Sequence, residues 1–145
     1  MAITRGTLPA ISDLMRDFGG RRLLLVDHQI QVRDTISLML QALGAEVVQA
    51  EDAMEALSLY PRHPFDAVLA DYDLPGMKGD ELAEFIKSVD SSQRVILLTG
   101  SLENFLETCR VPVRFDVVLS KPCTLAQLSL ALRYRTLEAP LPAAQ

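Results

Sequence analysis

Short apolar runs alternate with longer segments of helical periodicity along most of this chain. Residues 22–26 form an apolar run that is too short for a buried helix and is followed by Asp27. Continuous runs of this kind are typical of strands that are covered on both faces. The pattern predicts five strands, at residues 22–26, 46–50, 66–70, 94–98 and 115–119.

A segment with helical spacing follows each predicted strand. Gly44 supplies a stop signal for the first helix, Asp52 can cap the second, and Thr124 opens a capping box with Gln127. Five strand–helix units in sequence predict an α/β fold, a doubly wound (βα)5 domain with a five-stranded parallel sheet and right-handed crossovers. The predicted helices cover residues 30–43, 53–60, 80–88, 101–110 and 125–135.

Only short segments flank this predicted domain, which we assign to residues 21–135. Residues 1–20 are predicted to be an extension or a linker. Alternatively, they contain a short helix that ends at Gly19 and Gly20 and has apolar residues at Ile11, Leu14, Met15 and Phe18. Residues 136–145 read as a tail, too short for a DNA-binding module. We therefore expect a stand-alone domain or a piece of a larger protein.

Composition and charge narrow the function classes. The chain has 14 Lys and Arg against 19 Asp and Glu, a net charge of −5, which disfavours direct binding to nucleic acid. No apolar run approaches the roughly 18 residues that span a bilayer, and the N-terminus does not resemble a signal peptide, so we expect a cytoplasmic protein without a membrane partner. In that compartment Cys109 and Cys123 are expected to remain thiols rather than form a disulfide.

Four polar side chains stand where predicted strands end: Asp27, Asp71, Thr99 and Lys121. In an open parallel sheet these ends lie at one edge, where ligands bind. Clustered carboxylates suit a hard divalent ion such as Mg²⁺, and a lysine and a hydroxyl suit phosphate oxygens. A carboxylate among them can attack phosphorus and form an aspartyl phosphate.

Four ordered motifs carry a resemblance to a known family. The chain resembles the receiver domains of response regulators in two-component systems, which have a flavodoxin-like fold, over about residues 21–135. The motifs are Leu24-Leu25-Val26-Asp27, Asp71-Tyr72-Asp73-Leu74-Pro75-Gly76-Met77-Lys78-Gly79, Leu98-Thr99-Gly100 and Ser120-Lys121-Pro122.

This resemblance implies a role for each matching residue. Asp71 is the expected phosphoacceptor, Thr99 the switch hydroxyl, and Lys121 the partner of the phosphoryl group, followed by a proline that is often cis in the family. Asp27 and Asp71, with the backbone carbonyl of Asp73, would hold Mg²⁺, with Mn²⁺ as another candidate. Gly100 fits the need for a small residue beside the phosphoryl group.

The resemblance also implies partners. A histidine kinase or a phosphotransfer protein would supply the phosphoryl group, and the domain would be a signalling switch rather than an enzyme. Many receivers signal through a face that here comprises residues 101–135, and a homodimer through that face is one option.

Two positions depart from the family pattern. His28 stands where receivers usually have a second acidic residue, so it either joins the metal site or begins the loop facing solvent. As a ligand, it should weaken Mg²⁺ binding and make it sensitive to pH, because only the neutral imidazole ligates. Val118 stands where the family often has an aromatic residue that swings inward, and its stiff side chain excludes that switch.

Two other functions compete with a phosphorylated switch. Asp71-Tyr72-Asp73-Leu74 is similar to the Asp-x-Asp motif of haloacid dehalogenase-type phosphatases, but that motif follows the first strand rather than the third. The second alternative is a degenerate receiver that only binds proteins, which His28 and Val118 favour, whereas Asp71, Thr99 and Lys121 oppose it.

Overall fold

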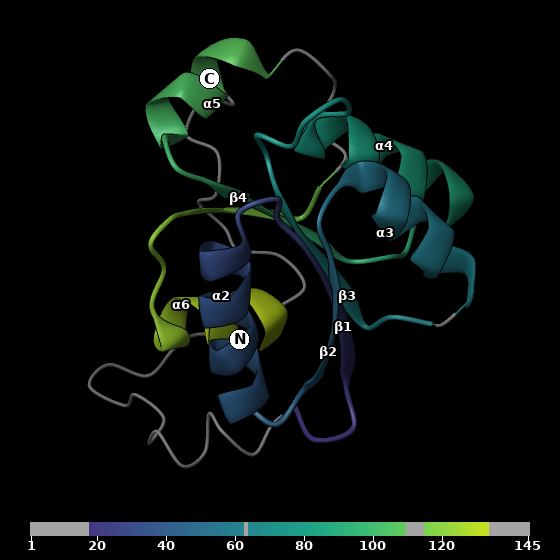
Figure 1. Ribbon diagram of the computed structural model, residues 1–145, viewed down its shortest axis with the longest axis vertical. Helices are drawn as coiled ribbons and strands as arrows, with labels where there is room; N and C mark the ends of the chain where they lie inside the picture. Colours follow the sequence, from purple (N-terminus) through teal and green to yellow (C-terminus); the bar gives the residue numbers. More distant parts are fainter. Residues whose placement is uncertain (1–17, 63, 110–114, 134–145) are drawn as a thin grey trace, which may run out of the picture.

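Five parallel strands form a single sheet in the order β2-β1-β3-β4-β5 (Figure 1). The structure is a computed structural model that describes residues 18–62, 64–109 and 115–133. β1 and β3, which carry the predicted carboxylates at their ends, are neighbours inside the sheet. The strands are β1 (Arg22–Val26), β2 (Glu46–Ala50), β3 (Ala67–Asp71), β4 (Val95–Thr99) and β5 (Val117–Ser120).

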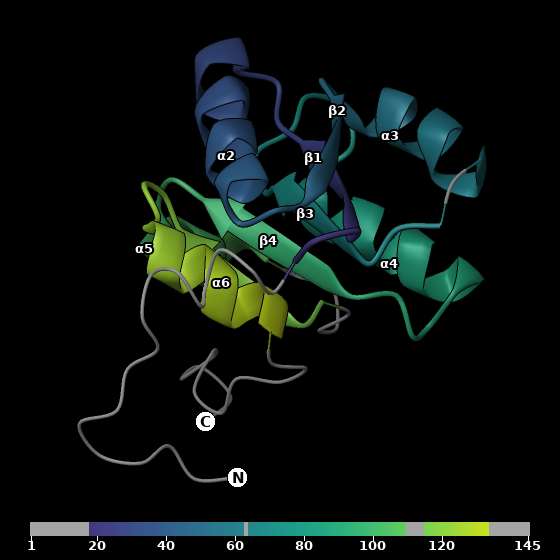
Figure 2. The ribbon, with the colours of Figure 1, turned by 90° about the horizontal axis from the view of Figure 1, so that it is seen from below.

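The helices cover both faces of the sheet, so the predicted doubly wound (βα)5 fold is confirmed (Figure 2). In the part of the chain that the structure describes, no helix combines the length and the apolar character needed to cross a membrane. The helices are α2 (Ile30–Ala42), α3 (Ala53–Leu59) with the 3₁₀ turn η1 (Tyr60–Arg62), α4 (Gly79–Val89), α5 (Leu102–Thr108) and α6 (Leu125–Arg133).

Neighbouring residues of each strand contribute to different halves of the core. Leu24 belongs to a cluster with residues of α3, α4 and α5, whereas Leu25 belongs to a cluster with residues of α2 and α6. Both leucines are fully buried, and burial of each such side chain stabilises the fold by about 1.5–3 kcal/mol. This two-sided burial is the reason that the strands read as continuous apolar runs.

Three strands, β3, β4 and β5, end one residue later than the sequence pattern indicates. β3 ends at Asp71 and β4 at Thr99, because both residues still pair with the neighbouring strand. β5 begins at Val117, two residues after the predicted start. Asp71 and Thr99 are therefore held by the sheet itself and not by the loops that follow.

The predicted helix signals act as expected. The Asp52 carboxylate accepts a hydrogen bond from the Glu55 amide at 2.8 Å, and Gly44 has φ +98 after α2. The Thr124–Gln127 capping box forms both hydrogen bonds, at 2.8 and 3.1 Å. The helix predicted over residues 101–110 is shorter, because Cys109 takes an extended conformation and α5 ends at Thr108.

Some expectations concern parts of the chain outside the described residues. They are the short helix around Ile11, Leu14 and Met15 and the tail at residues 136–145. Phe18, the last apolar residue of that predicted helix, is described, and it is buried in the core cluster of α2 and α6. The two cysteines are not joined by a disulfide.

Candidate functional site

The four predicted side chains lie at the carboxyl ends of four adjacent strands. Asp71 and Thr99 are the last residues of β3 and β4, and Asp27 and Lys121 directly follow β1 and β5. Residues that are nearly 100 positions apart in the chain therefore meet at one edge of the sheet. This is the position at which open α/β sheets bind their ligands.

Lys121 joins the two carboxylates of the site. Its Nζ lies 3.1 Å from Oδ2 of Asp27 and 3.4 Å from Oδ1 of Asp71. All three side chains are largely buried, and Asp27 is not exposed at all. The ammonium group offsets the repulsion between two carboxylates that the fold places side by side. The Lys121–Pro122 peptide bond is cis, as expected.

The carboxyl group of Asp71 is poorly stabilised in its charged form. Its burial raises the pKa above the ordinary value; Lys121 lowers this pKa, and the charge of Asp27 raises it further. The balance leaves the pKa raised, so Lys121 does not fully offset the cost of burying this charge. A bound cation would supply the missing positive charge.

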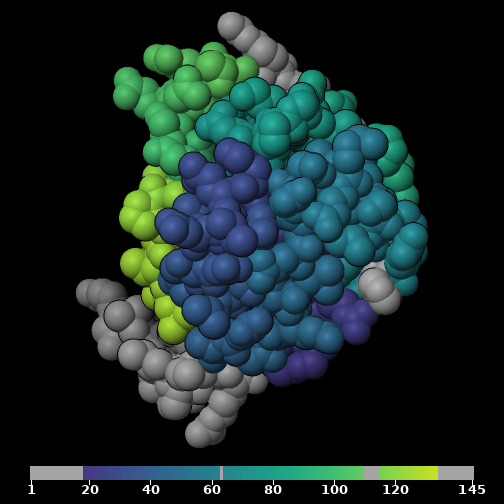
Figure 3. All heavy atoms as spheres, in the orientation of Figure 1, coloured from purple at the N-terminus to yellow at the C-terminus, as the bar shows by residue number. Residues whose placement is uncertain are grey.

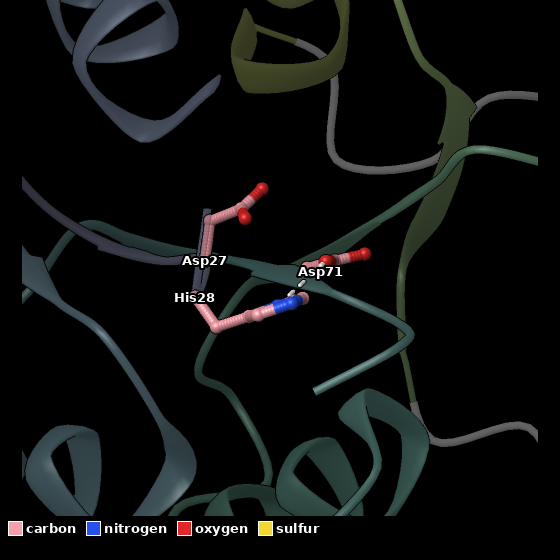
Figure 4. Close-up of side chains that lie close together, drawn as sticks. All are labelled: Asp27, His28 and Asp71. Atoms are coloured by element: carbon pink, nitrogen blue, oxygen red, sulfur yellow. Dashed lines mark ion pairs between the residues drawn. The ribbon is translucent and has the colours of Figure 1, made fainter. Parts of the chain in front are cut away.

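Three potential metal ligands converge here. Asp27, His28 and Asp71 each offer one ligand atom, and these atoms lie within 4.8 Å of one another. The imidazole of His28 points toward Asp71, with Nδ1 at 3.9 Å from Oδ2 (Figure 4). The Gln29 amide donates a hydrogen bond to Oδ1 of Asp27 at 2.9 Å and fixes that carboxylate. Two anionic oxygens and one nitrogen fit a divalent cation.

Asp73 stays close to the site through its backbone, while its side chain turns to Lys78. Its amide donates a hydrogen bond to Oδ1 of Asp71 at 3.2 Å. Its carboxylate accepts one from Lys78 Nζ, also at 3.2 Å, and is exposed. The metal role of its backbone carbonyl stays a prediction.

Thr99 is buried at the same edge but contacts the next loop. Its hydroxyl donates a hydrogen bond to the Ser101 carbonyl at 3.0 Å and accepts one from the Ser101 amide at 3.1 Å. Among the described residues no hydrogen bond joins it to Asp71. The Thr99 hydroxyl would have to leave the Ser101 carbonyl in order to donate a hydrogen bond to a group bound at Asp71.

Three aromatic residues form a row of ring contacts that begins directly after Asp71, and sequence reasoning gave a role to none of them. The Tyr72 ring packs edge-on against Phe105 with centroids 4.9 Å apart, and Phe105 packs against Phe115 at 5.6 Å. Val118 is buried in the same core cluster. These three aromatic residues lie directly after β3, in α5 and in the segment before β5, while position 118 itself is aliphatic.

Two further residues that the sequence did not single out shape the site. Arg33 of α2 donates hydrogen bonds to the Asp27 carbonyl at 2.6 Å and to the side chain of Gln49 at 2.8 Å. Gly79 begins α4 so close to β3 that a Cβ atom there would lie 2.5 Å from the Asp71 carbonyl oxygen. The glycine in the Pro-Gly-Met-Lys-Gly loop was the available signal for this close approach.

A pocket of about 560 Å³ opens beside Asp71 and Lys121. It lies between α2 and the segment after β5, and α2 and α6 are neighbours on this side of the molecule (Figure 3). Side chains of α2 line much of it, among them Val32, Ile36 and Met39. The acidic edge therefore adjoins a concave, largely apolar surface.

Comparison with known proteins gives a consistent result. The family model described as the response regulator receiver domain matches residues 23–133. Sporulation initiation phosphotransferase F of Bacillus subtilis (strain 168) is 32% identical over 89 residues, which are 60% of this chain and 72% of that protein. Two regulatory proteins of Pseudomonas aeruginosa also match, but the matched segment is only 28% of the length of one and 51% of the length of the other.

Solved structures share the fold. The response regulator protein TrrA of Thermotoga maritima, in complex with Mg²⁺ and BeF, has a TM-score of 0.69 and 27% identity, covering 78% of this chain and 96% of that one. The receiver domain of a sensor histidine kinase of Pseudomonas aeruginosa PAO1, with a magnesium ion coordinated in its active site cleft, has a TM-score of 0.72 and 28% identity. That match covers 79% of this chain and 96% of that receiver domain.

Proposed function

This chain belongs to the response regulator receiver domains of two-component signalling, and we propose that it is a phosphorylation-controlled switch whose phosphoacceptor is Asp71. Receiver domains are signalling switches, so steady turnover of a small substrate is not expected. The observation that carries the proposal is the contact of Lys121 Nζ with both Asp71, at 3.4 Å, and Asp27, at 3.1 Å.

Each side chain of the site has a role in this reaction. An oxygen of the Asp71 carboxylate attacks phosphorus while the bond from phosphorus to the donor nitrogen breaks, and the electron pair stays on that nitrogen. The ammonium of Lys121 pairs with the phosphoryl oxygens. The hydroxyl of Thr99, released from the Ser101 carbonyl, donates a hydrogen bond to another phosphoryl oxygen.

The carboxylates of Asp27 and Asp71 would hold Mg²⁺, together with the backbone carbonyl of Asp73. The geometry supports this, because ligand oxygens of the two carboxylates lie within 4.8 Å of each other at this edge of the sheet. When bound, the ion would stabilise charge that develops on the phosphoryl oxygens. Mn²⁺ is a second candidate for the same place.

A histidine kinase or a phosphotransfer protein is the proposed phosphoryl donor. The pocket beside Asp71 supports this, because it adjoins an apolar wall from α2 on which a donor protein can rest its surface. The face around residues 101–135 is the proposed output surface and the candidate dimer interface. The binding of Ser101, which caps α5, to Thr99 supports a link between the site and that face.

Chemical phosphorylation tests the proposal. The purified chain is incubated with acetyl phosphate and Mg²⁺ or Mn²⁺, and the covalent adduct is measured by mass spectrometry. We expect an adduct in wild type and in Asp73→Asn, whose altered side chain is exposed, and none in Asp71→Asn. Absence of any adduct in wild type with either ion would instead support a degenerate receiver that acts only by binding proteins.

A further inference from the structure

His28 offers the candidate metal site a nitrogen atom, which a purely acidic pair after β1 would lack. We infer that this site selects divalent transition-metal ions that accept nitrogen, such as Co²⁺ and Ni²⁺ with Mn²⁺ intermediate, over Mg²⁺. The inference rests on the proposed function only in placing the metal beside Asp71. It concerns which ion is held and makes no assumption about phosphorylation.

The position of His28 supports a ligand role. Its ligand atom lies within 4.8 Å of those of Asp27 and Asp71, as required of three atoms that share one ion. The imidazole faces Asp71 at 3.9 Å, too far for a hydrogen bond, and the carboxylate and the ring could both turn to an ion between them (Figure 4). Its side chain is 44% exposed, so the ring has room to adjust.

The charge of the site also disfavours Mg²⁺. Two carboxylates and the Lys121 ammonium leave one net negative charge when His28 is neutral. Mg²⁺ depends on hard oxygen ligands and gains little from imidazole. Co²⁺ and Ni²⁺ bind imidazole well. For these ions the nitrogen of His28 offsets the weaker electrostatic attraction of a site that has one carboxylate fewer.

Ion titrations on four proteins separate charge from ligand type. Dissociation constants for Mg²⁺, Mn²⁺, Co²⁺ and Ni²⁺ are measured by calorimetry on wild type, His28→Asn, His28→Asp and His63→Asn. His28→Asn keeps the neutral charge but replaces the nitrogen by an oxygen donor. His63→Asn changes the other histidine of the chain and controls for adventitious imidazole binding.

We expect the preference for Ni²⁺ and Co²⁺ over Mg²⁺ to be smaller in His28→Asn than in wild type, while Mg²⁺ affinity changes little. His28→Asp is expected to bind Mg²⁺ roughly thirtyfold more tightly, since a unit charge about 4 Å from a divalent ion is worth that much even in a water-like dielectric. Pulsed electron paramagnetic resonance of bound Mn²⁺ should show coupling to a nitrogen nucleus in wild type and His63→Asn but not in His28→Asn.

An unchanged Ni²⁺ to Mg²⁺ ratio in His28→Asn, or no nitrogen coupling in wild type, overturns the inference. Both outcomes are distinct from failure of the proposed function, which is read from the Asp71 adduct. A chain that forms the adduct but shows no nitrogen ligand keeps the function and loses this inference. A chain that shows the nitrogen ligand but forms no adduct keeps this inference and loses the proposed function.

Discussion

The phenolic oxygen of Tyr72 lies 2.9 Å from Oγ1 of Thr108, which joins the residue after Asp71 to the last residue of α5. The first turn of α5 is connected to the site as well, because Ser101, its cap, is hydrogen-bonded to Thr99. Both ends of this short helix are therefore tied to residues at or beside the site. Position 118, where the family often has an aromatic residue, is the buried Val118.

Removing the Tyr72 hydroxyl should destabilise the fold. We expect Tyr72→Phe to lower the free energy of unfolding by about 1 kcal/mol, because one partly buried hydrogen bond is lost while the ring contact with Phe105 remains. Denaturant unfolding measures the effect. In a cycle with Thr108→Val, the two losses should not add; full additivity would show that this hydrogen bond contributes nothing.

At neutral pH the buried charge of Asp71 should lower the free energy of unfolding, as expected of a residue that serves a reaction rather than the stability of the fold. Burial raises the pKa of Asp71 in the folded state above its ordinary value of 3.8. The contribution of Asp71 to the free energy of unfolding is therefore fully present below pH 3.8 and is lost as the pH rises through the pKa of the folded state. We therefore expect Asp71→Asn to be more stable than wild type at pH 7. The gain should disappear below the ordinary pKa, where both side chains are neutral.

Thermal unfolding of Asp71→Asn and wild type across this pH range measures the difference. Asp73→Asn, which alters an exposed carboxylate in the following loop, is the matched control and should follow wild type. Equal stability of Asp71→Asn and wild type at every pH would show that burial of the Asp71 charge costs the fold nothing.

Removing the bridging ammonium should be strongly destabilising. We expect Lys121→Met to lose on the order of 3 kcal/mol, because two buried carboxylates then face each other without a positive charge. A second change, Asp27→Asn, should recover part of this loss by removing one of the charges. Chemical denaturation of the single and double variants tests both statements, and no recovery in the double variant would contradict the explanation by charge.

A methyl group at Gly79 should disturb the site through the backbone. The Cβ atom would lie 2.5 Å from the Asp71 carbonyl oxygen and 2.8 Å from Tyr72 Cα, and neither atom can move as the end of a side chain can. We expect Gly79→Ala to cost about 1–3 kcal/mol through overpacking. Gly100→Ala is the control, since nothing lies within 4 Å of a Cβ there. Similar stability of the two variants would contradict this prediction.

The apolar runs and the capping residues determined most of the fold before any tertiary contact was known. Strands such as β1 are buried on both faces, and this appears in the sequence as a run without polar interruption. Asp52 and Thr124 act locally, over three residues, so their helix starts are readable as well. These elements imply a parallel sheet, and that topology places the residues at the strand ends, Asp27, Asp71, Thr99 and Lys121, at one edge.

Tertiary structure decided what these residues contact. The bridge from Lys121 to two carboxylates and the binding of the Thr99 hydroxyl to Ser101 depend on distances that no local pattern encodes. The close approach of Gly79 and the reach of Tyr72 to Thr108 likewise arise only when α4 and α5 pack on the sheet. Sequence alone left His28 either in the loop or at the metal site, and the packing of β1 beside β3 brings its imidazole to face Asp71.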